Sequence, residues 1–447
     1  MQTDLLSAAR QAFVVHPVSE VGGELRVPGD KSISHRTALL SAVADGSSTI
    51  EGFLLGDDCL ATVAAVRALG VDLTVHGGDL QVEGVGLDGL RAPAKPLNLG
   101  NSGTSMRLLA GLLASQSFDS ELTGDASLRR RPMERVALPL REMGAEVITQ
   151  SRTAPVRISG RYPLTAVDYT LPVASAQLKS ALLLAGMRAR GRTVIRSPGA
   201  SRDHTERLLR CMGVTVETRG DEVVSIRAPS RLDPIHTRVP GDFSSAAFFL
   251  VAGLLAARTG LLIPNVGVNP TRSGLLSIVK AMGGRIETRS PRILQGEPVA
   301  DLLVFESELR GIEVPPEWVP LAIDEFPAVF VAAACATGRT VIRGAEELRY
   351  KESDRLAVMA AGLRELGASV DERADGLVID GGWLQGGRVD AEGDHRVAMA
   401  FAVAATRARD TIEILGTDQV STSFPEFERI ASGCGLGIEI TVCRDPA

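Results

Sequence analysis

The sequence is poor in aromatic residues, cysteine and histidine, and each shortage argues against a class of function. Phe, Trp and Tyr make up 4% of the 447 residues, too few for the stacking surfaces of nucleic-acid-binding proteins. The formal net charge of −6 also disfavours a nucleic-acid partner. The five cysteines have no C-x-x-C spacing and the six histidines no paired spacing. We therefore expect neither a disulfide framework nor a metal site.

Long hydrophobic runs are missing as well. The longest apolar stretch, residues 246–257, is shorter than the roughly 20 residues that span a bilayer. The first residues, Met1 to Asp4, show no basic region ahead of an apolar run. We therefore expect no membrane span and no secretory signal. An odd number of cysteines without a pairing pattern fits a reducing cytoplasm.

What the sequence does contain is small and aliphatic. Hydrophobic residues make up 45% and charged residues 23%, with 46 glycines, which describes an ordinary globular protein. A core of Leu, Ala, Val and Ile suits packed α/β layers. At 447 residues the chain exceeds a single core, so two domains are expected.

One pattern recurs six times: a helical segment, an apolar residue with glycine, and a short alternating strand. Each glycine marks an expected helix C-terminus, because Gly adopts the left-handed conformation without a Cβ penalty. These glycines are Gly70, Gly144, Gly213, Gly283, Gly367 and Gly435, 68 to 84 residues apart by subtraction of their numbers. Between them lie Ala/Leu-rich helices, each followed by a β-branched strand. Six such units predict a layered α/β fold.

A repeated five-residue segment divides the six units into two groups. Residues 26–30 read Arg-Val-Pro-Gly-Asp, and the same five residues recur at 238–242. We interpret them as two strands that cross between domains. This assigns residues 29–240 to one three-repeat domain, and residues 1–28 with 241–447 to a discontinuous second one. A simple division into N-terminal and C-terminal halves is the alternative.

Polar residues collect just before each Ala/Leu-rich helix, where free N–H groups and the helix dipole favour anions. A second set precedes the other helices. Capping explains the Ser and Asp residues but not the accompanying cations. Those cations are Lys31, Arg36, Arg131, Lys351, Arg355 and Arg396. Because Arg forks suit carboxylates and phosphates, we expect a cleft that binds a multiply anionic substrate pair and closes over it.

Nucleotide motifs do not account for these cations. Residues 29–32 (GDKS) have only the tail of a P-loop, since position 24 is Glu24 instead of glycine. Residues 100–103 (GNSG) lack the G-x-G-x-x-G order, so dinucleotide binding has little support.

Seven segments carry a resemblance that runs nearly end to end. They are residues 29–36 (GDKSISHR), 99–104 (LGNSGT), 131–133 (RPM), 175–177 (SAQ), 202–205 (RDHT), 351–356 (KESDRL) and 394–396 (DHR). In this order they resemble the 5-enolpyruvylshikimate-3-phosphate synthases (3-phosphoshikimate 1-carboxyvinyltransferases). The resemblance implies an inside-out α/β barrel of two domains, each with three βαββαβ units and the active site in the cleft between them.

The resemblance also implies the reaction. The enolpyruvyl group of phosphoenolpyruvate would pass to the 5-hydroxyl of 3-phosphoshikimate through a tetrahedral intermediate, with release of phosphate. This is a step of the shikimate pathway, toward chorismate and the aromatic amino acids. The implied enzyme is a cytoplasmic monomer that needs no metal or organic cofactor and binds no nucleic acid or membrane.

Individual roles follow from the same resemblance. Lys31 would touch both substrates, and Gln177 would lie between them. The residues that would hold 3-phosphoshikimate are Ser32, Arg36, Ser175 and Lys351. The residues at phosphoenolpyruvate would be Arg131, Arg355 and Arg396, with Gly103 leaving room beside it. Asp324 would accept the 5-hydroxyl proton, and Glu352 would help to move protons at the methylene carbon.

Three positions depart from the usual pattern of this family. Ser421 stands just before residues 422–425 (TSFP), where members often have a Lys. Glu347 stands where many members have Asn, and Ala176 where many have a second Ser. These departures resemble the glyphosate-tolerant branch, but Gly103 leaves the phosphoenolpyruvate site unobstructed. The response to that inhibitor stays open.

Two alternatives remain. An enolpyruvyl transferase acting on a UDP-sugar typically uses a loop cysteine, which is absent around residues 129–131. A catalytically silent phospho-ligand sensor would tolerate the loss of Asp324 and Glu352, yet both are present.

Overall fold

The computed structural model describes residues 10–443, so the start of the chain, where no secretory signal is expected, lies outside the described part. Cα packing divides the chain into two compact units. Unit 1 comprises the described residues up to Val27, Gly241–Pro291 and the residues from Ala300 onward; unit 2 comprises Pro28–Pro240 and Arg292–Val299. Within residues 10–443, no helix combines the length and apolarity needed to cross a membrane.

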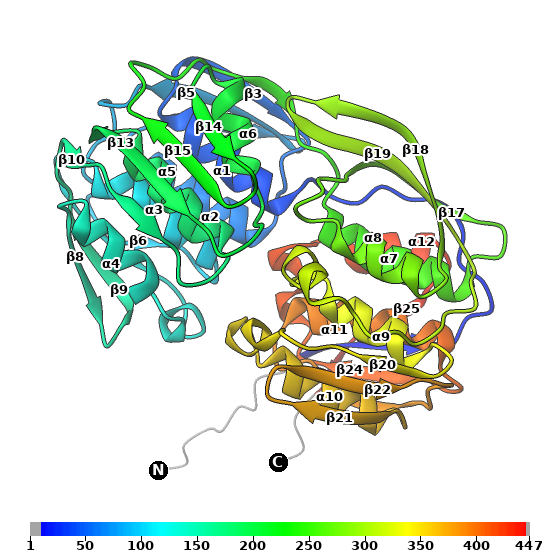
Figure 1. The fold of residues 1–447 in the computed structure, drawn as a ribbon. Helices are drawn as coiled ribbons and strands as arrows, with labels where there is room; N and C mark the ends of the chain where they lie inside the picture. Colours follow the sequence, from blue (N-terminus) through cyan, green and yellow to red (C-terminus); the bar gives the residue numbers. More distant parts are fainter. Residues whose placement is uncertain (1–9, 444–447) are drawn as a thin grey trace, which may run out of the picture. The chain divides into compact units, whose positions relative to one another are not determined.

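Unit 2 contains three copies of one supersecondary unit (Figure 1). The first copy runs α1 (Lys31–Ala42), β3 (Asp45–Glu51), α2 (Asp57–Ala68), β4 (Asp72–His76), β5 (Asp79–Val85). The second runs α3 (Gly103–Ala114), β7 (Asp119–Thr123), α4 (Glu134–Glu142), β8 (Glu146–Gln150), β9 (Thr153–Ser159). The third runs α5 (Ala176–Gly186), β13 (Arg192–Arg196), α6 (His204–Cys211), β14 (Val216–Arg219), β15 (Val223–Arg227).

Unit 1 contains the other three copies. The fourth runs α7 (Phe243–Ala256), β17 (Leu261–Gly267), α8 (Gly274–Ala281), β18 (Arg285–Leu294), β19 (Glu297–Phe305). The fifth runs α9 (Phe326–Ala334), β20 (Arg339–Val341), α10 (Arg355–Glu365), β21 (Ser369–Arg373), β22 (Gly376–Asp380). The sixth runs α11 (His395–Ala404), β24 (Ile412–Leu415), α12 (Phe427–Gly433), β25 (Gly437–Cys443). The predicted sixfold repeat is confirmed.

Five of the six repeat sheets share one strand order, in which the last strand of a copy lies between its first and second strands. The order in unit 2 is β16-β3-β5-β4, β6-β7-β9-β8 and β11-β13-β15-β14. The added edge strands β16 (His236–Arg238), β6 (Leu97–Asn98) and β11 (Asp168–Thr170) pair in parallel with the first strand of each copy. In unit 1, β2 (Gly23–Glu24) and β23 (Gly387–Asp390) have the same position.

The six glycines behave as predicted. Each lies just past the second helix of its copy, and their φ angles run from +80° to +102°. The left-handed conformation ends each helix and turns the chain into the next strand.

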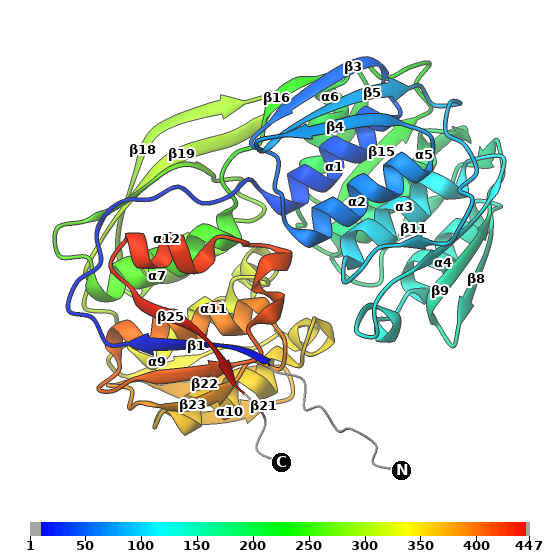
Figure 2. The same cartoon turned by 180° about the vertical axis from the view of Figure 1, so that it is seen from behind.

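The sixth sheet is completed from the far end of the chain. Strand β1 (Arg10–His16) lies between β24 and β25 and is antiparallel to both, with Val15 opposite Ile412 and Ile438. Figure 2 shows this strand, drawn in blue, among the orange and red strands of the C-terminal region. Without β1 this sheet would lack its inner strand, so the last repeat depends on the first described residues.

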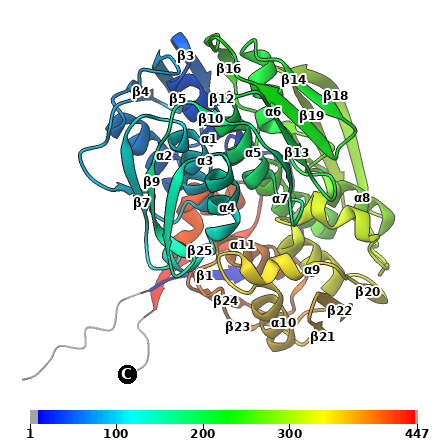
Figure 3. The same ribbon diagram turned by 60° about the vertical axis from the view of Figure 1, so that its left-hand side comes forward.

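Each unit has its own hydrophobic core, built around the first helix of every copy. In unit 2, α3 packs against α1 and α5, and the three helices lie inside the sheets (Figure 3). In unit 1, α7, α9 and α11 pack together, and all 14 residues of α7 are buried. Small aliphatic side chains let these helices approach closely, which explains why a chain with few aromatic residues still fills two cores.

The tip of the β18–β19 hairpin belongs to a different unit from the one that the sequence predicts. The domain division suggested by the sequence places residues 292–299 with the C-terminal segment, whereas their packing assigns them to unit 2. The reason is chemical: Glu297 and Gln295 bond to groups of unit 2. A hairpin tip of mixed polar and apolar residues gives no such signal in the sequence.

Candidate active site

The first helix start of unit 2 places a cation beside a carboxylate. Asp30 caps α1, with its Oδ1 accepting from the Ile33 N–H at 2.9 Å. The next residue, Lys31, has its Nζ 3.0 Å from Oδ2 of Asp58. Both side chains are largely withdrawn from solvent, at 14% and 11% exposure. The ammonium group is therefore held at the N-terminal end of a helix, where anions are favoured.

Arg36 lies one turn further along the same helix and is almost fully buried. Its Nη1 donates to the carbonyl oxygen of Ser32 at 2.8 Å, its Nε to Oγ1 of Thr205 at 2.7 Å, and its Nη2 to Oγ of Ser180 at 2.9 Å. Burial lowers the pKa of Arg36 to about 10, which still leaves the guanidinium charged at neutral pH. A side chain held at all three nitrogens has a fixed direction.

The start of α3 forms a second group in unit 2. Ser102 caps the helix by accepting from the Ser105 N–H. A Cβ at the next residue, Gly103, would lie 2.8 Å from Nη1 of Arg107 and 3.2 Å from Nη1 of Arg131. Arg131 also donates to Oδ1 of Asn101. Two guanidinium groups thus crowd the space that this glycine leaves open.

Gln177 belongs to this group through its amide. Its Oε1 accepts from Nη1 of Arg107 at 2.9 Å, and its Nε2 donates to Oγ1 of Thr104 at 2.9 Å. Two residues earlier, Ser175 caps α5 by accepting from the Leu178 N–H at 3.4 Å. The structure thereby brings Gly103, Arg131 and Gln177 together, with Arg107 as the bridge.

In unit 1 a carboxylate lies among three cations. Asp324 is 3.3 Å from Nζ of Lys351, 3.6 Å from Nη1 of Arg355 and 3.9 Å from Nη2 of Arg396. The backbone carbonyl of Asp324 also accepts from Nη1 of Arg396 at 2.7 Å. Five predicted site residues, these four and Glu352, therefore meet in one cluster.

Arg355 is the centre of that cluster and is 1% exposed. It donates to Oε2 of Glu352 at 2.7 Å and to Oδ2 of Asp394 at 2.8 Å. Burial opposes the charge of Arg355, but Asp394 and Glu352 outweigh it and raise its pKa. Burial likewise opposes the charge of Asp394, yet Arg355 holds the pKa of this carboxyl below its usual value. Each charge is stabilised by the other.

Sequence reasoning missed the residues that hold the predicted ones in place. Asp58 pairs with Lys31, Arg107 bridges Gly103 and Gln177, and Asp394 anchors Arg355. Asp394 could have been found, because it caps α11 at a helix start already singled out. Asp58 lies in the first turn of α2 and Arg107 in the largely buried α3, outside the polar segments singled out from the sequence.

Comparison with known proteins shows the family of the chain. The family model described as EPSP synthase (3-phosphoshikimate 1-carboxyvinyltransferase) matches residues 15–430. The chain belongs to the EPSP synthase family. Within this family, the 3-phosphoshikimate 1-carboxyvinyltransferase of Acidithiobacillus ferrooxidans is 54% identical over 96% of this chain and 99% of its own. The enzyme of the same name from Methylococcus capsulatus is 53% identical over 96% of this chain and 98% of its own.

Solved structures show the same fold. An EPSP synthase from Acinetobacter baumannii, 47% identical, covers 96% of this chain and 100% of its own with a TM-score of 0.87. The enolpyruvyl transferase NikO from Streptomyces tendae, at 19% identity and a TM-score of 0.79, covers 97% of this chain and 100% of its own and shares the fold. As a member of the EPSP synthase family, the chain is a transferase of the shikimate pathway that uses small-molecule substrates.

Proposed function

We propose that the helix-start clusters of units 1 and 2 together serve one reaction, the enolpyruvyl transfer of the EPSP synthase family. In this reaction the 5-hydroxyl oxygen of 3-phosphoshikimate bonds to C2 of phosphoenolpyruvate while C3 gains a proton. The tetrahedral intermediate then loses phosphate and a C3 proton, which restores the double bond. The observation that carries the proposal is the Asp324 carboxylate set among Lys351, Arg355 and Arg396.

Unit 1 supplies the groups that move protons. Asp324 accepts the 5-hydroxyl proton, a role that needs a carboxylate in a partly dry site. Glu352 serves the protonation and deprotonation of C3. Arg355 and Arg396 hold phosphoenolpyruvate, whose carboxylate and phosphate match the guanidinium fork. A cluster dense in cations also stabilises the charge that develops in the tetrahedral intermediate.

Unit 2 supplies the rest of the binding site. Lys31 contacts both substrates from the start of α1, and Gln177 lies between them. Ser32, Arg36 and Ser175 hold 3-phosphoshikimate, together with Lys351 of unit 1. Arg131 contacts phosphoenolpyruvate, which fits into the space left by Gly103.

We further propose that residues 29–240 form one domain and that residues 1–28 with 241–447, apart from the hairpin tip at 292–299, form the other. The repeated five-residue segment and the shared repeat topology support this division. The enzyme works as a cytoplasmic monomer and uses neither a metal nor an organic cofactor, since proton transfer and anion binding suffice for the chemistry.

Phosphate release tests the reaction. Purified protein should release phosphate only when 3-phosphoshikimate and phosphoenolpyruvate are supplied together, and omission of either should abolish release. Activity with UDP-N-acetylglucosamine as the acceptor, in a protein silent toward 3-phosphoshikimate, would favour the UDP-sugar alternative instead.

A further inference from the structure

The tip of the β18–β19 hairpin is held in an unfavourable backbone conformation. Two residues, Gln295 and Gly296, connect the strands, with φ angles of +47° and +81°. Tight hairpin turns with two positive φ angles prefer Asn or Gly at the first position. A glutamine is strained there, and the conformation persists because the surroundings fix it.

The surroundings that fix this tip are one face of α6. Nη1 of Arg207 donates to the carbonyl oxygen of Gly296 at 2.7 Å, and Sγ of Cys211 donates to that of Gln295 at 3.3 Å. His204, Arg207 and Cys211 are spaced three and four residues apart, so they share a helix face. The Gln295 amide adds a bond from its Nε2 to the His236 carbonyl oxygen at 3.1 Å.

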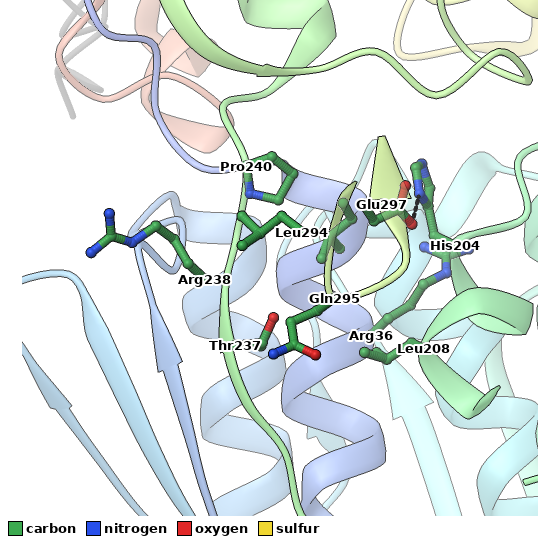
Figure 4. A pocket seen from close by; sticks show the side chains of 10 residues that line it. Arg36, His204, Leu208, Thr237, Arg238, Pro240, Leu294, Gln295 and Glu297 are labelled. Atoms are coloured by element: carbon green, nitrogen blue, oxygen red, sulfur yellow. Dashed lines mark hydrogen bonds and ion pairs between the residues drawn. The ribbon is translucent and has the colours of Figure 1, made fainter. Parts of the chain in front are cut away.

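Glu297 makes the most buried of these tip contacts. Its Oε1 lies 2.8 Å from Nδ1 of His204, and the two side chains are 9% and 2% exposed. Both border a cavity of about 10 Å³ that Arg36 also lines (Figure 4). A cavity of this size accommodates at most a single water molecule, so Glu297 meets no substrate through it.

The contact leads directly to a substrate-binding side chain. His204 and Thr205 are the first two residues of α6. Thr205 accepts from Nε of Arg36 and is 2.7 Å from Oγ of Ser180, which accepts from Nη2 of the same arginine. One Arg36 contact is therefore made to the start of α6, and a second, to Ser180 of α5, is linked to that start through Thr205.

We propose that Glu297 is a positioning residue for Arg36, acting through His204 and the first turn of α6. The proposal rests on the proposed role of Arg36 at 3-phosphoshikimate. The hairpin tip fixes the start of α6, Thr205 and Ser180 fix the guanidinium, and the guanidinium meets the substrate in a set direction. Binding of 3-phosphoshikimate should depend on Glu297, whereas the proton transfers should not.

Steady-state kinetics on Glu297→Ala tests this role. We expect the KM for 3-phosphoshikimate to rise by about tenfold, typical for the loss of one buried charged hydrogen bond. The KM for phosphoenolpyruvate and kcat should change by less than about twofold. Glu297→Gln should recover most of the affinity because its amide oxygen still accepts from His204. The matched control is Ile293→Ala, which removes a 68% exposed side chain of the same hairpin and should have wild-type constants.

The double variant of Glu297→Ala and Arg36→Lys shows whether Glu297 acts on the KM for 3-phosphoshikimate through Arg36. If it does, adding Glu297→Ala to Arg36→Lys should raise the KM for 3-phosphoshikimate by much less than tenfold. Glu297→Asp, which keeps the charge but withdraws it from His204, should also raise this KM and provides the test if the alanine variant does not fold.

Two results would overturn the proposal. One is a Glu297→Ala enzyme with the kinetic constants of Ile293→Ala. The other is an equal loss in kcat and both KM values, which a purely structural contact predicts. Inactive wild-type protein would instead reject the proposed function, so the two failures can be told apart.

Discussion

Nζ of Lys351 lies 3.3 Å from Oδ1 of Asp324, and the two side chains are 24% and 15% exposed. An ammonium group beside a carboxylate in a partly dry site can exchange a proton with a substrate held between them. The same carboxylate faces Arg355 and Arg396, so its charge is balanced before any substrate arrives. This cluster sets the first prediction.

Asp324→Asn should lower kcat by about 10²- to 10⁴-fold, because an amide cannot accept the 5-hydroxyl proton. The fold should persist, since the amide keeps the shape of the side chain. Phosphate release measured with both substrates at saturation gives kcat. The matched control, Asp380→Asn, removes an exposed carboxylate paired with Arg339 and should leave kcat unchanged. A variant that keeps wild-type kcat would remove Asp324 from the mechanism.

Lys31→Met should lower kcat/KM by two or more orders of magnitude, because the ammonium proposed to contact both substrates is lost while the aliphatic stem remains. Asp58→Asn should give a smaller loss, since it weakens only the contact that orients Lys31. Lys95→Met, at an exposed position of the same unit, is the control and should match the wild type. Equal kinetics for the variants at positions 31 and 95 would contradict the site assignment.

Gly103→Ala should raise the KM for phosphoenolpyruvate by about tenfold, equivalent to about 1.4 kcal/mol. The added Cβ would lie 2.8 Å from the Arg107 guanidinium and 3.2 Å from that of Arg131. Both are ends of flexible side chains, so they shift while the fold survives. Thermal unfolding should therefore be unchanged. A rise confined to the KM for 3-phosphoshikimate would assign this space to the other substrate.

Stability should depend on the Asp394 carboxyl in acid. Burial disfavours its charge, but Arg355 outweighs burial and lowers its pKa below the unfolded value of about 3.9. The ion pair therefore contributes fully above that value, and its contribution is lost as pH falls through the folded pKa. Urea unfolding between pH 7 and pH 3 measures this loss.

Asp394→Asn should reduce the free energy of unfolding by about 3–5 kcal/mol at pH 7, since it leaves Arg355 buried without its partner. It should also flatten the pH dependence below about pH 4. Asp168→Asn breaks an exposed pair with Arg196 and should cost much less. If the free energy of unfolding of the variant changes with pH as steeply as that of the wild type below about pH 4, another carboxyl titrates in this range.

The repeat architecture could be predicted from the sequence because its signal is local. Glycine after each second helix and polar residues before each first helix are set by a few neighbouring residues. Both features appear in the structure at all six copies, from Gly70 to Gly435. The cations at the helix starts were found for the same reason.

The residues that hold those cations in place could not be predicted. Asp58 meets Lys31 across two helices, and Thr205 meets Arg36 across a sequence separation of 169 residues. Such pairs depend on how the helices pack, which no short stretch of sequence encodes. The attachment of residues 292–299 to unit 2 has the same origin.

Strand β1 imposes an order of events on a chain made from its N-terminus. Val15 leaves the ribosome early, but its partners Ile412 and Ile438 emerge only at the end of synthesis. Residues 28–240 can pack while translation continues, whereas β1 must wait unpaired for the last repeat. Strands that are so far apart in the sequence pair slowly. The final folding step of the nascent chain should therefore be the pairing of β1 with β24 and β25.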